Sequence, residues 1–95
     1  MIFLPAAREE ATEAQDWYAR SAPGLGARFR TGLDRTVRRI AANPAQFPVT
    51  VGDIRRALLH IFPYALFFRF VGDSVYVIAC FHSSRDPKIW RGRVS

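Results

Sequence analysis

The sequence predicts a single α+β domain over residues 1–95, in which a two-helix hairpin packs on a three-stranded antiparallel meander, followed by a short C-terminal tail. Apolar residues recur at helical spacing between residues 6 and 42. After Pro48, β-branched and aromatic residues gather in three short runs. A length of 95 residues suits one core, and a hydrophobic content of 49% is enough to pack it.

The first predicted helix covers Ala6–Arg20, preceded by Pro5, which suits the first position of a helix. The turn at residues 21–24 ends it. One face is apolar and the other is largely acidic; the apolar face consists of Ala7, Ala11, Ala14 and Tyr18.

The second predicted helix covers Leu25–Ala42 and ends at Asn43-Pro44, because the residue before proline disfavours the helical conformation. The connection to the first helix is short, so the two form an antiparallel hairpin. The apolar stripe consists of Leu25, Phe29, Leu33, Val37 and Ile40. Five arginines lie largely off that stripe: Arg28, Arg30, Arg35, Arg38 and Arg39.

The predicted strands are Ile54–Phe62, Tyr64–Val71 and Ser74–Phe81, with a tight turn at Gly72-Asp73. Short connections make neighbouring strands partners, which gives the meander. One sheet face should pack on the helices and the other should stay at least partly open. In the last strand, strict alternation places one set of side chains on a common face: Val75, Val77, Ala79 and Phe81.

The charge balance points to an acidic partner. Lysine and arginine number 14 against 8 acidic residues, giving a net charge of +6, and Lys88 is the single lysine. An arginine-rich genome would explain the preference for arginine over lysine, but it would not explain the net charge. A domain this small and basic favours nucleic acid or an acidic protein as its partner.

The motifs of most enzyme classes are missing. The sequence has no glycine-rich phosphate loop and no nucleophile elbow. Cys80 lies in an apolar strand, where a buried thiol is the expected state, and one cysteine with two histidines makes a metal site improbable. We therefore expect no metal and no cofactor. The lone cysteine, the lack of an N-terminal signal and the shortness of the apolar runs favour a cytoplasmic protein without membrane spans.

Basic and imidazole groups in the strand half suggest two alternatives. Arg55, Arg56, His82 and Arg85 are candidate catalytic residues for metal-free acid–base cleavage of RNA. The alternative is structural: arginines at sheet edges are commonly solvated and discourage aggregation, and a histidine at a strand end commonly bonds to a backbone carbonyl. The residues alone slightly favour the structural alternative.

A partner-binding surface is the other candidate. The arginines of the second helix form either a solvated face or the surface on which an acidic segment lies. Trp17 and Tyr18 are difficult to bury together, so one of them should remain exposed as an anchor. The candidate binding residues are Trp17, Tyr18, Arg35, Arg38, Arg39 and Arg69.

The ordered set of motifs resembles the RelE/ParE toxin superfamily of bacterial type II toxin–antitoxin modules. The resemblance covers nearly the whole chain and is closest to the ParE-like branch, also labelled plasmid stabilisation proteins. The motifs are Phe3-Leu4-Pro5 leading to Asp16-Trp17-Tyr18, Pro23-Gly24-Leu25-Gly26 with Phe29, Asn43-Pro44 with Phe47-Pro48, Asp53 to Leu58, Phe62-Pro63-Tyr64, and His82 to Pro87 with Trp90.

The resemblance implies a short strand ahead of the helices and a cognate, ParD-like antitoxin whose acidic C-terminal segment wraps the toxin. The six candidate binding residues would then be antitoxin-binding residues, and operator DNA would be contacted only through the antitoxin. ParE-type toxins poison DNA gyrase. RelE-type toxins cut messenger RNA on the ribosome without a metal, using basic residues and a C-terminal tyrosine.

Departures from the RelE pattern favour the ParE-like alternative. Lysines are missing around the first meander strand, and Ile89 or Trp90 stands near the position of the C-terminal tyrosine. The resemblance therefore implies an antitoxin-neutralised gyrase inhibitor. Two alternatives stay open: a ribosome-dependent messenger RNA endoribonuclease, and an inactive chain that binds the antitoxin as a co-repressor. Only Met1 and Ile2 precede Phe3, so either the first strand is short or the start codon was assigned too late.

Overall fold

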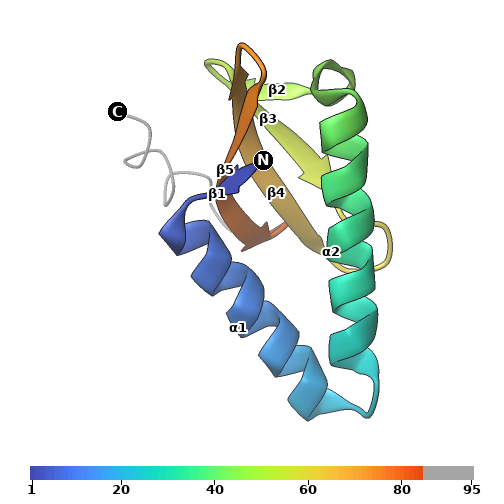
Figure 1. The fold of residues 1–95 in the computed structure, drawn as a ribbon. Helices are drawn as coiled ribbons and strands as arrows, with labels where there is room; N and C mark the ends of the chain where they lie inside the picture. Colours follow the sequence, from blue (N-terminus) through green and yellow to red (C-terminus); the bar gives the residue numbers. More distant parts are fainter. Residues whose placement is uncertain (85–95) are drawn as a thin grey trace.

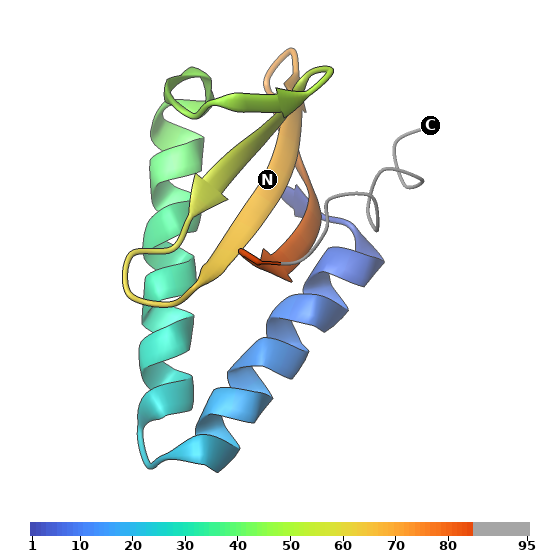
Figure 2. The same cartoon turned by 180° about the vertical axis from the view of Figure 1, so that it is seen from behind.

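The computed structural model describes residues 1–84 and shows a helical hairpin packed on a mixed sheet (Figures 1 and 2). The sheet has five strands in the order β1-β5-β4-β3-β2, with β1 parallel to β5 and the other pairs antiparallel. The elements are β1 (Ile2–Phe3), α1 (Pro5–Ser21), α2 (Leu25–Ala42), the 3-10 helix η1 (Pro44–Gln46), β2 (Val49–Val51), β3 (Ile54–Leu58), β4 (Tyr64–Val71) and β5 (Ser74–His82). None of the described helices is long and apolar enough to cross a membrane.

The helices meet at a tight turn and diverge toward the sheet, as both views show (Figures 1 and 2). Gly24 precedes α2 with φ of 77°, a conformation in which a side chain would be strained. Gly26 allows the helices to approach closely, because a Cβ at this position would lie 2.7 Å from the Ala19 Cβ. The predicted hairpin is thus confirmed, and two glycines explain its geometry.

The main core lies between the hairpin and one face of the sheet. Phe29, Leu33 and Ile40 of α2 are almost fully buried there, and they pack with Leu66 and Phe68 of β4. The buried residues of α1 are all alanines, and their small side chains let that helix pack closely on β5. Burial of this apolar surface at roughly 25 cal/mol per Å² is the main stabilising contribution to the fold.

The centre of the opposite sheet face is also buried, although its edge is open. Leu58 is 49% exposed on this face, as the partly open prediction requires. Six side chains form the buried centre: Ile54, Ala65, Phe67, Ile78, Ala79 and Phe81. β4 is apolar on both faces at its centre, so it contributes Leu66 and Phe68 to the cluster under the helices and Phe67 to the cluster on the opposite face.

A bulge in β5 overturns the strict alternation expected from the sequence. Phe68 pairs with Val77, whereas its neighbour Phe67 pairs with Ala79, so Ile78 is an extra residue in β5. Beyond the bulge the faces exchange: Ala79 lies on the open face and Cys80 packs against the helices. Val75, Val77, Ala79 and Phe81 therefore do not share one face.

Two further differences concern the sheet edges. β3 is shorter than the predicted Ile54–Phe62, because Leu59 closes the pairing by donating its N–H to the Tyr64 carbonyl. Residues 60–63 then form a loop that contains Pro63. β2 was absent from the predicted meander and makes a small hairpin with β3 around Gly52, whose φ is 56°. The strand implied ahead of the helices is present as β1, with two residues.

Candidate partner-binding surface

An arginine row runs along one side of α2. Arg28, Arg35 and Arg39 follow one another at spacings of seven and four residues, which places them on the same helix side. All three are exposed, and the Arg39 guanidinium lies 5.1 Å from the centre of the Phe47 ring. Within residues 1–84, the two ion pairs are Arg30–Asp34 and Arg69–Asp53. The row, defined here as Arg28, Arg35 and Arg39, therefore has no carboxylate partner in the described part of the chain.

The aromatic pair at the end of α1 divides into an exposed and a supporting member. Trp17 is 56% exposed, which confirms that one of the two stays open. Tyr18 is half-buried, stacked on Phe29 at 5.3 Å and edge-on to Phe62 at 4.7 Å between ring centres. Burial raises the pKa of the Tyr18 phenol. Trp17 is thus available to a partner, whereas Tyr18 anchors the hairpin to the sheet.

Arg69 lies away from these binding candidates. It shares a sheet face with Phe67, opposite the helices, and its Nη2 donates to Asp53 Oδ2 at 2.8 Å. The structure therefore brings Arg35 and Arg39 together on α2 but does not join Arg69 to them. Arg38 is exposed on another side of the helix. The candidate set also omits Arg28, although its spacing of seven residues from Arg35 was a usable signal.

The catalytic candidates do not converge. Arg55 is on the helix side of the sheet, and its Nη1 donates to the Phe47 carbonyl at 2.6 Å. Arg56 pairs with Phe67 and is exposed on the opposite face. Arg55 pairs with Phe68 of β4, whereas His82 pairs with Tyr64, four residues away on the same strand. Arg55 and His82 are also two strands apart in the sheet, so their Cα atoms are roughly 16 Å from each other.

His82 is engaged at the end of β5, at a pocket that Trp17 also lines. Its Nδ1 accepts the Ser84 N–H at 3.2 Å, and its ring stands edge-on to Tyr64 at 5.4 Å. This histidine is therefore bonded to the backbone at a strand end, but it accepts an N–H and does not donate to the carbonyl that the structural alternative supposed. Arg85 lies outside the described residues.

Cys80 also lines the pocket at this end. Burial, reinforced by the negative charge of Glu10, raises the pKa of Cys80 to about 12, so the thiol is protonated near neutral pH. Among residues 1–84, no group of three or more histidine, cysteine or acidic side chains is placed to hold a metal ion. What the described surface offers is exposed arginine and an exposed indole, which suit the binding of a partner.

Comparison with known proteins identifies the family. The model of the ParE toxin of type II toxin–antitoxin system, parDE, matches residues 1–87. The chain belongs to this family. ParE membership implies a cognate antitoxin, which is ParD in a ParDE system.

A solved structure shares the ParE fold. A chain described as "Chromosomal ParDE TA system from P. aeruginosa" superposes with a TM-score of 0.73 at 17% identity, covering 84% of this chain and 90% of that one. A search of curated proteins finds no match. The hairpin and five-stranded sheet therefore form the fold of a ParE toxin. The resemblance to the RelE/ParE toxin superfamily that was inferred from the motifs is confirmed.

Proposed function

We propose that this ParE-family chain arrests growth by inhibiting DNA gyrase and that the acidic segment of a cognate antitoxin neutralises it. The observation that carries the proposal is the separation of Arg55, Arg56 and His82 into different parts of the sheet. A metal-free ribonuclease needs its basic and proton-transferring groups around one phosphate. A toxin that acts by binding has no such requirement, so the geometry favours inhibition over cleavage.

The unpaired arginines of α2 support the neutralisation step. Arg28, Arg35 and Arg39 present three positive charges without a carboxylate in residues 1–84. Complementary charge accelerates association and selects the partner. Trp17 would add an aromatic anchor near the end of α1, close to the turn after which α2 begins, since tryptophan and arginine are the residues enriched among binding hot spots. An acidic antitoxin segment meets both features.

The test is induced expression of the chain without an antitoxin. We expect growth arrest together with trapped gyrase–DNA cleavage complexes in the induced cells. Primer extension should show no codon-edge cuts in messenger RNA. Cuts without trapped complexes would overturn the gyrase target in favour of the ribosome-dependent nuclease, and absence of growth arrest would indicate the inactive co-repressor.

Two variants sharpen the choice between inhibition and cleavage. The double variant His82→Ala with Arg85→Ala should kill as efficiently as the parent, because neither residue is needed for binding gyrase in this proposal. Abolished killing by a folded double variant would count for catalysis. Trp17→Ala should remain toxic but be neutralised less efficiently by a co-expressed antitoxin, since its indole faces solvent in the free chain.

A further inference from the structure

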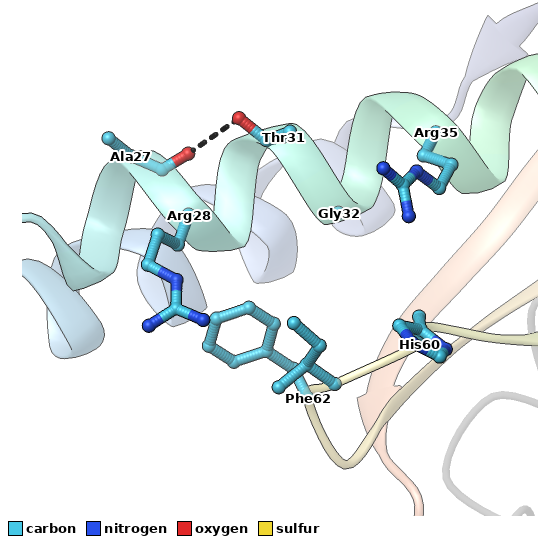
Figure 3. Close-up of a pocket in the computed structure, with 8 residues that line it drawn as sticks. Ala27, Arg28, Thr31, Gly32, Arg35, His60 and Phe62 are labelled. Carbon is cyan, nitrogen blue, oxygen red and sulfur yellow. Dashed lines mark hydrogen bonds between the residues drawn. The ribbon is translucent and has the colours of Figure 1, made fainter.

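A pocket lies between α2 and the loop that joins β3 to β4 (Figure 3). Its volume is about 240 Å³, and both elements contribute to its lining. Arg28, Gly32 and Arg35 come from α2, while His60, Ile61 and Phe62 come from the loop. In Figure 3 the two arginines flank the pocket along the helix, with the Phe62 ring and His60 across from them. The pocket therefore combines a cationic rim with an apolar floor.

The floor is apolar and already formed in the free chain. Gly32 leaves space in the middle of α2, where an added Cβ would lie 3.8 Å from the Phe62 Cδ2, an ordinary van der Waals contact. The Phe62 ring is fixed from behind by Tyr18 at 4.7 Å and Phe29 at 5.2 Å. Ile61, which is 65% exposed, extends the apolar surface to solvent. An incoming side chain would meet a rigid surface and pay little for reorganising it.

The size of the pocket suits an anchor side chain better than a whole ligand. Pockets for small molecules commonly occupy about 300–1,000 Å³, and this one is smaller. The rim sets the surroundings of the anchor, because Arg28 and Arg35 are exposed and form no ion pair with residues 1–84. Seven residues separate them, which corresponds to about 10.5 Å along a helix.

We propose that this pocket binds one aliphatic side chain of an acidic helical segment, with Arg28 and Arg35 binding carboxylates on either side of it. The inference rests on the proposed function, because the segment is assigned to the cognate antitoxin. Arg28, Gly32 and Arg35 are spaced by four and three residues. A partner helix running antiparallel along α2 would match them with glutamate, leucine and glutamate at positions i, i+3 and i+7.

Other occupants fit the pocket less well. Residues 85–95 of the chain carry four basic side chains against one acidic one, so like charges oppose their docking beside the arginines. Single-stranded nucleic acid binds through stacking on exposed aromatic rings as well as through charge. Phe62 is only 7% exposed, and the remaining apolar lining is aliphatic.

The experiment uses the isotopically labelled full chain and a synthetic alanine-based helical peptide that presents glutamate, leucine and glutamate at i, i+3 and i+7. NMR titration should shift the amides of Gly32, His60 and Ile61. Exchanging the peptide leucine for serine, or its glutamates for lysine, should weaken binding at least about 10-fold. A peptide that shifts none of these amides at millimolar concentration would overturn the proposal.

Matched variants of the chain separate the pocket from general charge. Arg35→Glu should weaken the peptide about 10-fold or more, whereas Arg30→Glu, the same charge change on another side of α2, should weaken it less than about 3-fold. Gly32→Leu should abolish binding by filling the pocket, and circular dichroism checks that the variants fold. Equal losses for Arg30→Glu and Arg35→Glu, or full binding by folded Gly32→Leu, would refute the assignment.

Two further outcomes would assign the pocket to another occupant. If a poly-uridine oligonucleotide shifts the same amides more strongly than the peptide, the rim binds nucleic acid and the proposal fails. If Gly32→Leu changes the sedimentation of the chain alone, a second copy occupies the pocket and the proposal fails. The peptide titration is independent of toxicity. Peptide binding without growth arrest would refute the gyrase proposal alone, and growth arrest with trapped gyrase but no peptide binding would refute the pocket alone.

Discussion

Alanine substitution at two glycines of α2 should change stability in opposite directions. At Gly26, a Cβ would lie 2.7 Å from the Ala19 Cβ and 3.1 Å from both the Ala19 Cα and the Gln15 carbonyl oxygen. At Gly32, a Cβ would lie 3.8 Å from the Phe62 Cδ2, which is ordinary van der Waals contact. The same chemical change on the same helix therefore tests whether the close approach of α1 and α2 is enforced.

The magnitudes follow from two terms. Overpacking in a tight contact costs about 1–3 kcal/mol, while replacing glycine by alanine within a helix gains up to about 1 kcal/mol. Gly26 is the second residue of α2, where the propensity gain is smaller. We expect Gly26→Ala to lose about 1–2 kcal/mol and Gly32→Ala to gain up to about 1 kcal/mol. For a domain of this size, each kcal/mol shifts Tm by about 4–8 °C.

The assay is thermal unfolding of the full chain followed by circular dichroism. Adding Ala19→Gly to Gly26→Ala removes the methyl group that a Cβ would meet first, so the pair should show a favourable coupling of at least about 0.5 kcal/mol in a double-mutant cycle. A rise in Tm for Gly26→Ala equal to that of Gly32→Ala would refute the reasoning, because it would mean that the two helices separate freely.

Three further predictions concern other parts of the molecule. Arg55→Ala should lower the free energy of unfolding by about 1.5–3 kcal/mol, because it removes the hydrogen bond from the charged guanidinium to the Phe47 carbonyl. Arg56→Ala should change the free energy of unfolding by less than about 0.5 kcal/mol. Urea titration compares the two variants, and similar losses would contradict a structural role of Arg55 alone. Cys80 should react with a thiol reagent only when the chain unfolds, and rapid labelling of the folded chain at pH 8 would contradict its burial. The free energy of unfolding should also fall as the pH rises from the ordinary thiol pKa of 9.0 toward the folded pKa of about 12, because in this range the thiol loses its proton in the unfolded chain and keeps it in the folded one. Glu10→Ala should lower the free energy of unfolding by about 1.5–3 kcal/mol, because it removes the carboxylate that accepts the Cys80 N–H at 3.1 Å. An unchanged urea midpoint would contradict this prediction and show that water replaces the bond without cost.

The helices and the central strands could be predicted because local chemistry dictates them. α2 (Leu25–Ala42) and β4 (Tyr64–Val71) match the predicted bounds. Glycine or proline stands at or beside most of these ends, and such residues stop an element wherever the rest of the chain lies. α1 is longer than its prediction by one residue at each end and β5 by one residue at its C-terminal end, which is within the normal variation of helix and strand boundaries.

The remaining features depend on contacts between distant residues. The bulge at Ile78 leaves no local mark in a run of apolar residues, since alternation and its interruption use the same residue types. β3 stops at Leu58 because the loop before β4 closes onto Tyr64. The residue pattern of 59–63 gives no local sign that the Leu59–Tyr64 hydrogen bond ends the strand there.

The site was predictable to the extent that helical spacing decides it. The arginine row on α2 can be predicted from the helical spacing of Arg35 and Arg39. The exposure of one member of the aromatic pair can be predicted because two large adjacent rings are difficult to bury together. By contrast, Arg55 and Arg56 are neighbours in sequence but point to opposite faces, and only the pairing of β3 decides which one bonds to Phe47. The pocket beside Gly32 depends on a loop 28 or more residues away in the sequence, so no local pattern marks it.

The parallel pairing of β1 with β5 imposes an order on biosynthesis. Ile2 pairs with Tyr76 and Phe3 with Val77, so the first strand has no partner until the last one has left the ribosome. At about 5–20 residues per second, nearly the whole synthesis time passes with the sheet incomplete while the helical hairpin, built from local contacts, is already available. The arginine row on α2 can therefore be present on the nascent chain before the sheet that supports the hairpin is complete.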